Sequence, residues 1–322
     1  MKLYFLRWVT WLSLLAILNS CDISSMPSTP LRIAIHSWPG YEFIFLAHQE
    51  KWIDQQVKLV ETKSATNSLQ ALKDGLVDGA ALTLDEVLRA REMQIPLTIV
   101  LIFDISAGAD MLIAKPNIKN LTDLKGKRIG VEQNALGAVM LSQALQTSGL
   151  DPLDIEQVAL TIDQHEHAWK SGEIDALITF DPIASHLLSL DAHRLYDSRQ
   201  IPNLIIDVLA IHQKAIDTHK GAIKHLIAGH FKALNHFSNN TQDASYRMAT
   251  HLNVAPAKVV TNYKGLLLPD IKKNHLQLAG KNPKLLQSAN LLSAIMLKSN
   301  ILKQPSSSQD LCLADFLPSE PL

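Results

Sequence analysis

The chain of 322 residues has little cysteine, and this limits how it can be stabilised. Its two cysteines, Cys21 and Cys312, lie near opposite ends of the sequence. With so few cysteines there is no disulfide framework, and the fold is expected to depend on a hydrophobic core. The length is sufficient for about two domains of ordinary size.

An excess of charge of one sign is also missing, because 30 Lys and Arg residues face 31 Asp and Glu residues. No basic patch stands out, so nucleic acid is not an expected partner. After residue 20 there is no run of about 20 apolar residues, the length that a membrane-spanning helix needs. No second membrane segment is therefore expected.

The common catalytic and cofactor motifs are absent as well. There is no Gly-x-Ser-x-Gly nucleophile turn, no Gly-Lys-Ser/Thr phosphate loop and no dinucleotide glycine triad. His165-Glu166-His167 has a histidine pair, but zinc sites on helices need histidines four residues apart. The sequence therefore predicts a protein that is not an enzyme and has no cofactor or metal.

The first twenty residues have the pattern of an export signal. Lys2 and Arg7 are basic, and Trp8 to Leu18 is an apolar run too short to span a bilayer. Leu18-Asn19-Ser20-Cys21 then resembles the lipobox of bacterial lipoproteins, in which the cysteine is lipidated. This predicts a signal peptide over 1–20 and a lipidated N-terminus with a Ser/Pro-rich tether over 21–30. An incidental cysteine or an ordinary N-terminal helix remain alternatives.

From Leu31 to about residue 212, short apolar runs alternate with segments of helical length. The expected strands are 31–35, 57–60, 79–82, 97–103, 110–114, 128–131, 154–159, 175–179 and 204–211. Expected helices are 41–52, 221–238, 242–252, 256–264 and 283–297. The alternation is typical of an α/β fold with mostly parallel sheets covered by helices.

A weak internal repeat predicts two similar lobes. Gly75-Leu-Val-Asp78 leads into a strand that ends at Thr83-Leu-Asp85, and Gly172-Glu-Ile-Asp175 leads into one that ends at Thr179-Phe-Asp181. Ligands of open α/β sheets bind beyond the carboxyl ends of strands. Chance similarity of two βα units is the alternative interpretation.

Three strings could supply a ligand site at such strand ends. Ser37-Trp38-Pro39-Gly40-Tyr41-Glu42 offers aromatic rings and a carboxylate, although Glu42 could serve only the helix dipole and Trp38 only the core. Asp104-Ile-Ser106-Ala-Gly108-Ala-Asp110 offers polar groups or is a plain turn. Glu132-Gln-Asn134-Ala-Leu-Gly137 precedes a helix whose free N–H groups could bind an acceptor.

From Arg32 to about residue 300 the chain resembles the nitrate/sulfonate/taurine-type substrate-binding proteins of ABC importers, a group that includes thiamine-precursor binders. The resemblance rests on Trp38-Pro39-Gly40-Tyr41, Gly75-Leu-Val-Asp78 with Thr83-Leu-Asp85, Asp104-x-Ser106-x-Gly108-Ala-Asp110 and Asp123-Leu-Lys-Gly126-Lys-Arg-Ile-Gly130-Val. The resemblance implies a two-lobed, type II-like periplasmic-binding-protein (clamshell) fold with two crossover segments, near Asp104–Lys115 and Ile205–His212. Lobe one would comprise 31–110 plus 210–322, and lobe two 111–209. Related enzymes on this fold need a His/Cys-rich iron motif, which this chain lacks.

By the same resemblance, the ligand-binding residues would be Trp38, Gly40, Tyr41, Glu42, Thr83, Asp85, Ser106, Asp110, Asn134, Gly137, Asp181 and Asp207. These candidate residues include five carboxylates, Glu42, Asp85, Asp110, Asp181 and Asp207, and no Arg or Lys. Buried carboxylates repel an anion unless a helix N-terminus dominates. A small polar ligand bearing amine or amide groups, or a flat nitrogen heterocycle, is therefore favoured.

The resemblance implies a monomeric lipoprotein that binds a small molecule and delivers it to an ABC permease. A ligand-sensing subunit for a membrane signalling protein is the alternative, and an enzyme on the same fold is a third. Asp22 after the cysteine resembles the signal that keeps lipoproteins on the inner membrane, although Asn19 departs from the usual small residue. The expected location is the periplasmic face of that membrane.

Overall fold

The computed structural model describes residues 29–132 and 135–319. The predicted signal peptide and Cys21 lie outside these residues, and so does Asn134. Leu31–Leu322 form one compact unit. Within the described part of the chain, no helix is long and apolar enough to cross a membrane.

The first sheet has six strands, and segments far apart in the sequence build it. Its order is β11-β4-β10-β3-β1-β2, with β1, β2 and β3 parallel and β10 and β11 running antiparallel to their neighbours. The strands are β1 (Leu31–Ile35), β2 (Val57–Glu61), β3 (Gly79–Thr83), β4 (Leu97–Ser106), β10 (Ile206–His212) and β11 (Leu266–Leu267). β3 and β4 are buried along their whole length, as expected for strands covered on both faces.

The second sheet has five strands in the order β7-β6-β8-β5-β9. Here β6 is parallel to β7 and β8, and β5 is antiparallel to β8 and β9. The strands are β5 (Met111–Ala114), β6 (Arg128–Val131), β7 (Glu156–Ala159), β8 (Ala176–Thr179) and β9 (His193–Asp197). Each sheet thus has three neighbouring parallel strands followed by an antiparallel strand, β10 in the first sheet and β5 in the second.

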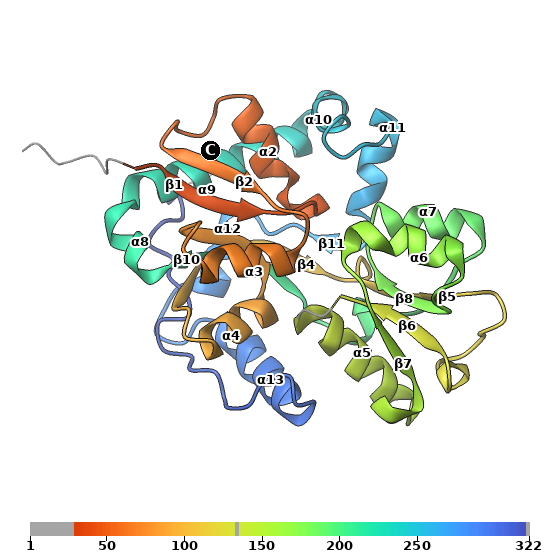
Figure 1. Ribbon diagram of the computed structural model, residues 1–322. Coiled ribbons are helices and arrows are strands. Elements are labelled where there is room, and N and C mark those ends of the chain that lie inside the picture. Colours follow the sequence, from red (N-terminus) through yellow and green to blue (C-terminus); the bar gives the residue numbers. More distant parts are fainter. Residues whose placement is uncertain (1–28, 133–134, 320–322) are drawn as a thin grey trace, which may run out of the picture. The chain divides into compact units, whose positions relative to one another are not determined.

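Helices cover both sheets (Figure 1). Around the first sheet, α3 and α4 pack on the strands from one side, while α2 and α9 pack together near β2. Around the second, α5 contacts β5, β6 and β8, whereas α6 and α7 pack together. The helices are α2 (Glu42–Gln49), α3 (Ala65–Lys73), α4 (Leu84–Glu92), α5 (Ala135–Ser148), α6 (His165–Ser171), α7 (Ile183–Leu190), α8 (Gln213–Thr218), α9 (Lys220–Asn239), α10 (Thr241–Met248), α11 (Pro256–Val259), α12 (Ile271–Leu278) and α13 (Leu285–Lys298).

The acidic residue of each repeat unit forms the same Arg–Asp pair in its sheet. Arg32 at the start of β1 donates its backbone N–H and its guanidinium to Asp78, which precedes β3. Arg128 at the start of β6 makes the corresponding bonds to Asp175, which precedes β8. The acidic residue of each repeat unit therefore ties the first parallel strand to the third. The same bidentate pairing lowers the pKa of both carboxyl groups.

At Asp78 burial is the largest single influence on the carboxyl group and acts to raise its pKa, but the hydrogen bonds and charge of Arg32 together outweigh it. At Asp175 the hydrogen bond from Arg128 is the largest influence, and it lowers the pKa against a smaller effect of burial. Both carboxyl groups are therefore ionised at neutral pH and form ion pairs with Arg32 and Arg128.

Two segments link the sheets, as predicted. The first, residues 107–110, joins β4 to β5, and the second, residues 198–205, joins β9 to β10. The second link lies just before the expected Ile205–His212, because residues 206–212 form a strand in the middle of the first sheet. The proposed boundaries of the two lobes remain a prediction.

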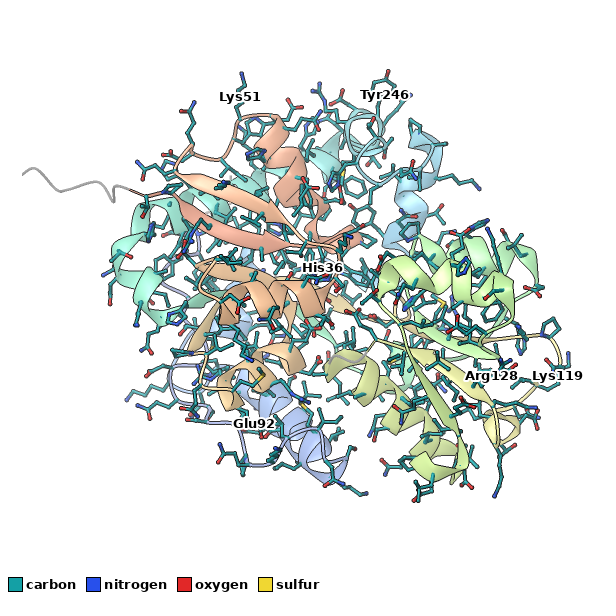
Figure 2. The ribbon with its side chains drawn as sticks, viewed as in Figure 1. His36, Lys51, Glu92, Lys119, Arg128 and Tyr246 are labelled. Atoms are coloured by element: carbon teal, nitrogen blue, oxygen red, sulfur yellow. The ribbon has the colours of Figure 1, made fainter. Side chains whose placement is uncertain are left out.

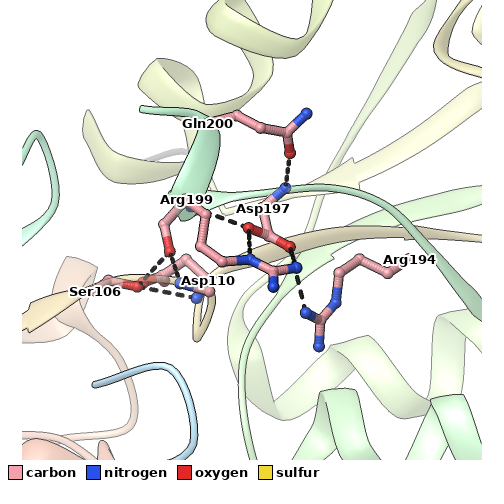
Figure 3. A network of polar contacts seen from close by, with 8 residues as sticks. Ser106, Asp110, Arg194, Asp197, Arg199 and Gln200 are labelled. Carbon is pink, nitrogen blue, oxygen red and sulfur yellow. Dashed lines mark hydrogen bonds and ion pairs between the residues drawn. The ribbon is translucent and has the colours of Figure 1, made fainter. Parts of the chain in front are cut away.

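Hydroxyl groups hold the two linking segments together (Figure 3). The Ser106 and Ser198 side-chain oxygens are 2.7 Å apart, and Gly108 donates its N–H to Ser198 at 2.6 Å. Asp110 donates its N–H to Ser106 at 3.1 Å. Next to this chain of bonds, Arg199 pairs with Asp197 through two side-chain contacts. Both links are thus fixed to each other at the point where the chain passes between the sheets.

The C-terminal tail packs on the first sheet. Leu313 donates its N–H to Ile99 in β4, and Ile99 donates its N–H to Leu311. Leu311, Phe316 and Leu317 are buried. The tail therefore covers part of β4, in agreement with the apolar residues near its end.

Candidate functional site

A small cavity lies where strands of both sheets end. Its volume is about 20 Å³, enough for about one water molecule. Two of the lining residues lie in β3 and β10, and the others lie in segments or helices that follow β1, β2, β3, β4, β6, β7 and β8. They are His36, Trp38, Ala65, Thr83, Glu86, Asp110, Glu132, Leu136, Ile162, Phe180 and Asp207. Any larger ligand requires the groups on either side of this cavity to move apart.

Trp38 and Gly40 fix the side chain of Asp104 at one wall. Trp38 follows β1 and donates its ring N–H to Asp104 at 2.9 Å. A Cβ atom on Gly40 would lie 1.7 Å from the Asp104 Oδ2 atom, so only glycine leaves room for that carboxylate. Burial raises the pKa of Asp104 to about 7, although the hydrogen bond from Trp38 opposes the shift.

Tyr41 holds a second carboxylate in β10. Its hydroxyl donates to Asp207 Oδ1 at 2.5 Å, while Asp207 Oδ2 has no hydrogen-bond partner among the described residues. Asp207 pairs in register with Asp104 of β4 and with Thr83 of β3. Burial, followed by the negative charge of Asp104, raises the pKa of Asp207 well above its ordinary value. The adjacent strands thus place two carboxylates together.

Further carboxylates surround this pair. Asp85 and Glu86 lie in the first turn of α4, and Asp110 lies on the first linking segment. Burial raises the pKa of Asp85 to about 7 and that of Asp110 to about 6. It also raises the pKa of Glu86 well above its ordinary value. Asp110 Oδ2 has no hydrogen-bond partner in the described part of the chain.

No Lys or Arg is among the described residues that line the cavity. Carboxylates buried together in this way repel one another and favour protonation or a bound cation. A protonated amine or a set of N–H donors would supply what the unpartnered oxygen atoms lack. The arrangement is therefore suited to a ligand that donates hydrogen bonds and carries positive charge.

Other side chains complete the walls. His36, which is labelled in Figure 2, directly follows β1 and is buried. Its Nδ1 atom has no partner among the described residues, and burial lowers its pKa to about 4. Trp38 packs edge-on against Phe180, which follows β8 in the second sheet, with ring centroids 4.9 Å apart. Glu132, which follows β6, is 8% exposed.

The structure brings four of the predicted ligand residues to the cavity: Trp38, Thr83, Asp110 and Asp207. Four other predicted residues do not line the cavity but contact or position the carboxylates near it. Gly40 leaves space for Asp104, Tyr41 bonds Asp207, Asp85 lies close enough to Asp110 for their charges to interact, and Ser106 bonds the Asp110 backbone.

The other predicted ligand residues are placed differently. Glu42 lies against His251, with both carboxylate oxygens 2.8 Å from the His251 Nδ1 atom. Asp181 accepts a hydrogen bond from the Ser185 N–H and caps α7. Gly137 is buried in the first turn of α5, next to the lining residue Leu136, and Asn134 is outside the described residues.

Sequence reasoning did not include His36, Glu132 and Phe180 among the ligand residues. All three directly follow a strand, so the rule that ligands bind at carboxyl ends of strands would have indicated them. Ala65, Glu86, Leu136 and Ile162 also line the cavity, but each reaches it through the packing of a helix or short turn.

The His165-Glu166-His167 string does not converge on a common point. His165 is buried against the Thr179 hydroxyl, 3.1 Å away, while Glu166 pairs with Lys170 and His186 on the surface. No group of three potential metal ligands is found within the described residues.

Comparison with protein families gives a match to the model described as NMT1/THI5 like, over residues 46–244. This match covers more than half of the chain. The chain belongs to the NMT1/THI5-like family. β1 and the residues directly after it precede the matched region, whereas β2 to α9 fall inside it.

A relative of this NMT1/THI5-like chain is the "Putative aliphatic sulfonates-binding protein" of Escherichia coli (strain K12). The two are 25% identical over 142 residues, which is 44% of each chain. The matched region therefore spans less than half the length of that curated relative.

Solved structures show the fold. The alkanesulfonate-binding protein SsuA from Xanthomonas axonopodis pv. citri, bound to MOPS, has a TM-score of 0.74 at 17% identity, covering 88% of this chain and 98% of that one. The desulfurization enzyme DSZB has a TM-score of 0.61 at 14% identity, covering 89% and 97%. The NMT1/THI5-like chain thus has the predicted two-lobed periplasmic-binding-protein fold with two crossover segments.

Proposed function

We propose that this protein is a solute-binding protein that captures a small polar ligand in the cleft between its two sheets and delivers it to an ABC importer. The observation that carries the proposal is the set of buried carboxylates near the strand ends. Among the described residues, Asp85, Asp104, Asp110 and Asp207 each have at least one carboxylate oxygen without a hydrogen-bond partner. The relatives that bind sulfonates support solute binding as the general role.

The favoured ligand bears amine or amide groups or is a flat nitrogen heterocycle. Asp110 and Asp207 supply acceptors, and the rings of Trp38 and Phe180, which pack edge-on against each other, supply aromatic surface at the cavity. A cationic ligand would relieve the repulsion among the carboxylates, whereas a sulfonate would increase it. The ligand therefore differs in charge from those named for the relatives.

The remaining parts of the proposal concern location. A lipid on Cys21 would anchor the chain at the periplasmic face of the inner membrane, where a permease lies. Mass spectrometry of the mature N-terminus tests this part, since an unmodified cysteine or a different cleavage position would contradict it.

Thermal-shift screening of residues 22–322 tests the ligand. The panel contains amino-heterocycles and alkyl amines, with nitrate, taurine and alkanesulfonates as the opposing set. A ligand present at a hundred times its Kd is expected to stabilise the fold by about 2.7 kcal/mol. Tight binding of the anions without binding of any amine would refute the proposed ligand class.

Variants then locate the binding. Asp85→Ala and Trp38→Ala are expected to abolish the shift while the circular dichroism spectrum stays that of the parent. Asp217→Ala serves as the control because its carboxylate is 81% exposed, on α8. Unchanged binding in the first two variants would remove them from the site.

A further inference from the structure

Glu132 connects the two sheets through a helix N-terminus. It follows β6 of the second sheet, yet its Oε1 atom accepts from the Thr66 hydroxyl at 2.8 Å and lies 3.4 Å from the Thr66 N–H. Thr66 is in the first turn of α3, which packs on β1 and β3 of the first sheet. The first turn of a helix has unpaired N–H groups and a positive dipole end, and it favours negative charge.

The chain's own carboxylates also hold amide donors at two other helix starts near the cavity. At α4, Glu86 accepts from the Thr83 N–H at 3.0 Å. At α7, Asp181 accepts from the Ser185 N–H at 2.8 Å. An anionic ligand would need such amides, because no Lys or Arg is among the described lining residues. At these three helix starts a carboxyl group of the chain itself already accepts from the helix, so the donors are not free for an anionic ligand.

Glu132 differs from the other two carboxylates because it reaches across from the opposite sheet. It also lines the cavity beside His36, whose buried Nδ1 atom has no partner among the described residues. A ligand that fills the cavity therefore has to place a polar group near His36 Nδ1. The neighbouring Glu132 carboxylate then disfavours a negative charge on that group.

We propose that Glu132 is a specificity-determining residue that occupies the anion position at the N-terminus of α3 and thereby excludes anionic solutes from the cleft. This inference rests on the proposed function of the cleft as a solute site. Removal of the carboxylate frees the Thr66 donors and takes one negative charge from the cavity wall. An alkanesulfonate can then accept from the Thr66 N–H and hydroxyl that Glu132 occupied.

The test compares ethanesulfonate binding to the purified wild-type protein and to Glu132→Ala by isothermal titration calorimetry. The wild type is expected to bind ethanesulfonate at least tenfold more weakly than Glu132→Ala. Glu132→Gln keeps the size of the side chain and removes its charge, and is expected to lie between them. It also provides a measurement if Glu132→Ala does not fold, as judged by circular dichroism.

Two further variants separate position from net charge. Glu173→Ala removes an exposed carboxylate that follows α6, and its binding is expected to match that of the wild type. Asp110→Ala removes a cavity carboxylate that does not cap α3. An equal gain in Asp110→Ala, equal binding by the wild type and Glu132→Ala, or no gain in either Glu132 variant would overturn the role of Glu132.

The test of Glu132 can fail without the proposed ligand class failing, and the reverse also holds. Absence of any amine ligand for the wild type would count against the proposed ligand class, while the difference between the wild type and Glu132→Ala is measured with ethanesulfonate alone. A wild type that binds amines with no change in sulfonate affinity at Glu132 would overturn only the specificity role.

Discussion

The close approach of Gly40 to Asp104 gives a sharp prediction about stability. In Gly40→Ala, the added methyl group would meet the Asp104 Oδ2 atom at 1.7 Å and the Trp38 Nε1 atom at 2.8 Å. Asp104 is fully buried in β4 and has Asp207 of β10 opposite it, so its short side chain cannot turn away freely. The substitution therefore has to break the bond between Trp38 and Asp104.

The magnitude follows from two effects. Overpacking of a well-packed interior costs about 1–3 kcal/mol. Loss of a hydrogen bond to a carboxylate adds about 1.5–3 kcal/mol when the acceptor stays buried. We expect Gly40→Ala to lower the free energy of unfolding by roughly 2.5–6 kcal/mol, measured by urea denaturation with far-UV circular dichroism.

Gly221→Ala is the matched control, because a Cβ atom at this position in α9 would have nothing within 4 Å. It is expected to leave stability unchanged or raise it by up to about 1 kcal/mol. In an Asp104→Ala background, Gly40→Ala should cost far less, since the obstructing carboxylate is gone. A cost below about 1 kcal/mol in the wild type, or the same cost in both backgrounds, would refute the reasoning.

The remaining predictions concern charge. The pKa values of Asp85 and Asp104 are raised to about 7, so the folded state holds protons that the unfolded state has released, and stability is lost as the pH rises through 7. Each group contributes about 1 kcal/mol between pH 6 and pH 8. His36, His165 and His230 oppose this trend by up to about 1 kcal/mol each, because burial lowers their pKa values to about 4, 4 and 3 while the unfolded histidines still bind protons near pH 6. Burial also raises the pKa values of Glu86 and Asp207 well above their ordinary values, so these groups add to the loss, and the ligand-free protein should be more stable at pH 6 in urea denaturation. Equal stability at both pH values would contradict the prediction. Asp175→Ala leaves the Arg128 guanidinium and N–H without their acceptor and should lower the free energy of unfolding by about 1–3 kcal/mol, with Asp78→Ala similar and Asp217→Ala near zero.

The alternation of apolar runs and helical segments predicted much of the strand content. β6 begins and ends at the expected residues, and β3 differs by a single residue. β9 was missed because His193-Arg-Leu-Tyr-Asp mixes charged and apolar residues at an edge of its sheet. α12 was also missed, since its eight residues contain several polar side chains among few apolar ones.

The candidate site was predictable where a residue follows a strand directly. Trp38 and Thr83 reach the cavity for this reason. Glu42 shows the limit, because its partner His251 lies 209 residues further along the chain. Which side of α2 faces that histidine depends on the packing of α10 against α2, and no local pattern in the sequence contains this information.

The different make-up of the two sheets has a consequence for folding. The second sheet is built from one continuous stretch, Met111 to Asp197, whereas the first needs β1 to β4, then β10 more than a hundred residues later, and finally the tail. Pairings between distant segments form slowly, because a long loop must close first. The second sheet can therefore form while β4 still has an open edge, and pulsed hydrogen exchange would show protection in β6 and β8 before β3 and β4. Until β10 arrives, that edge is the part of the chain most open to association with other chains.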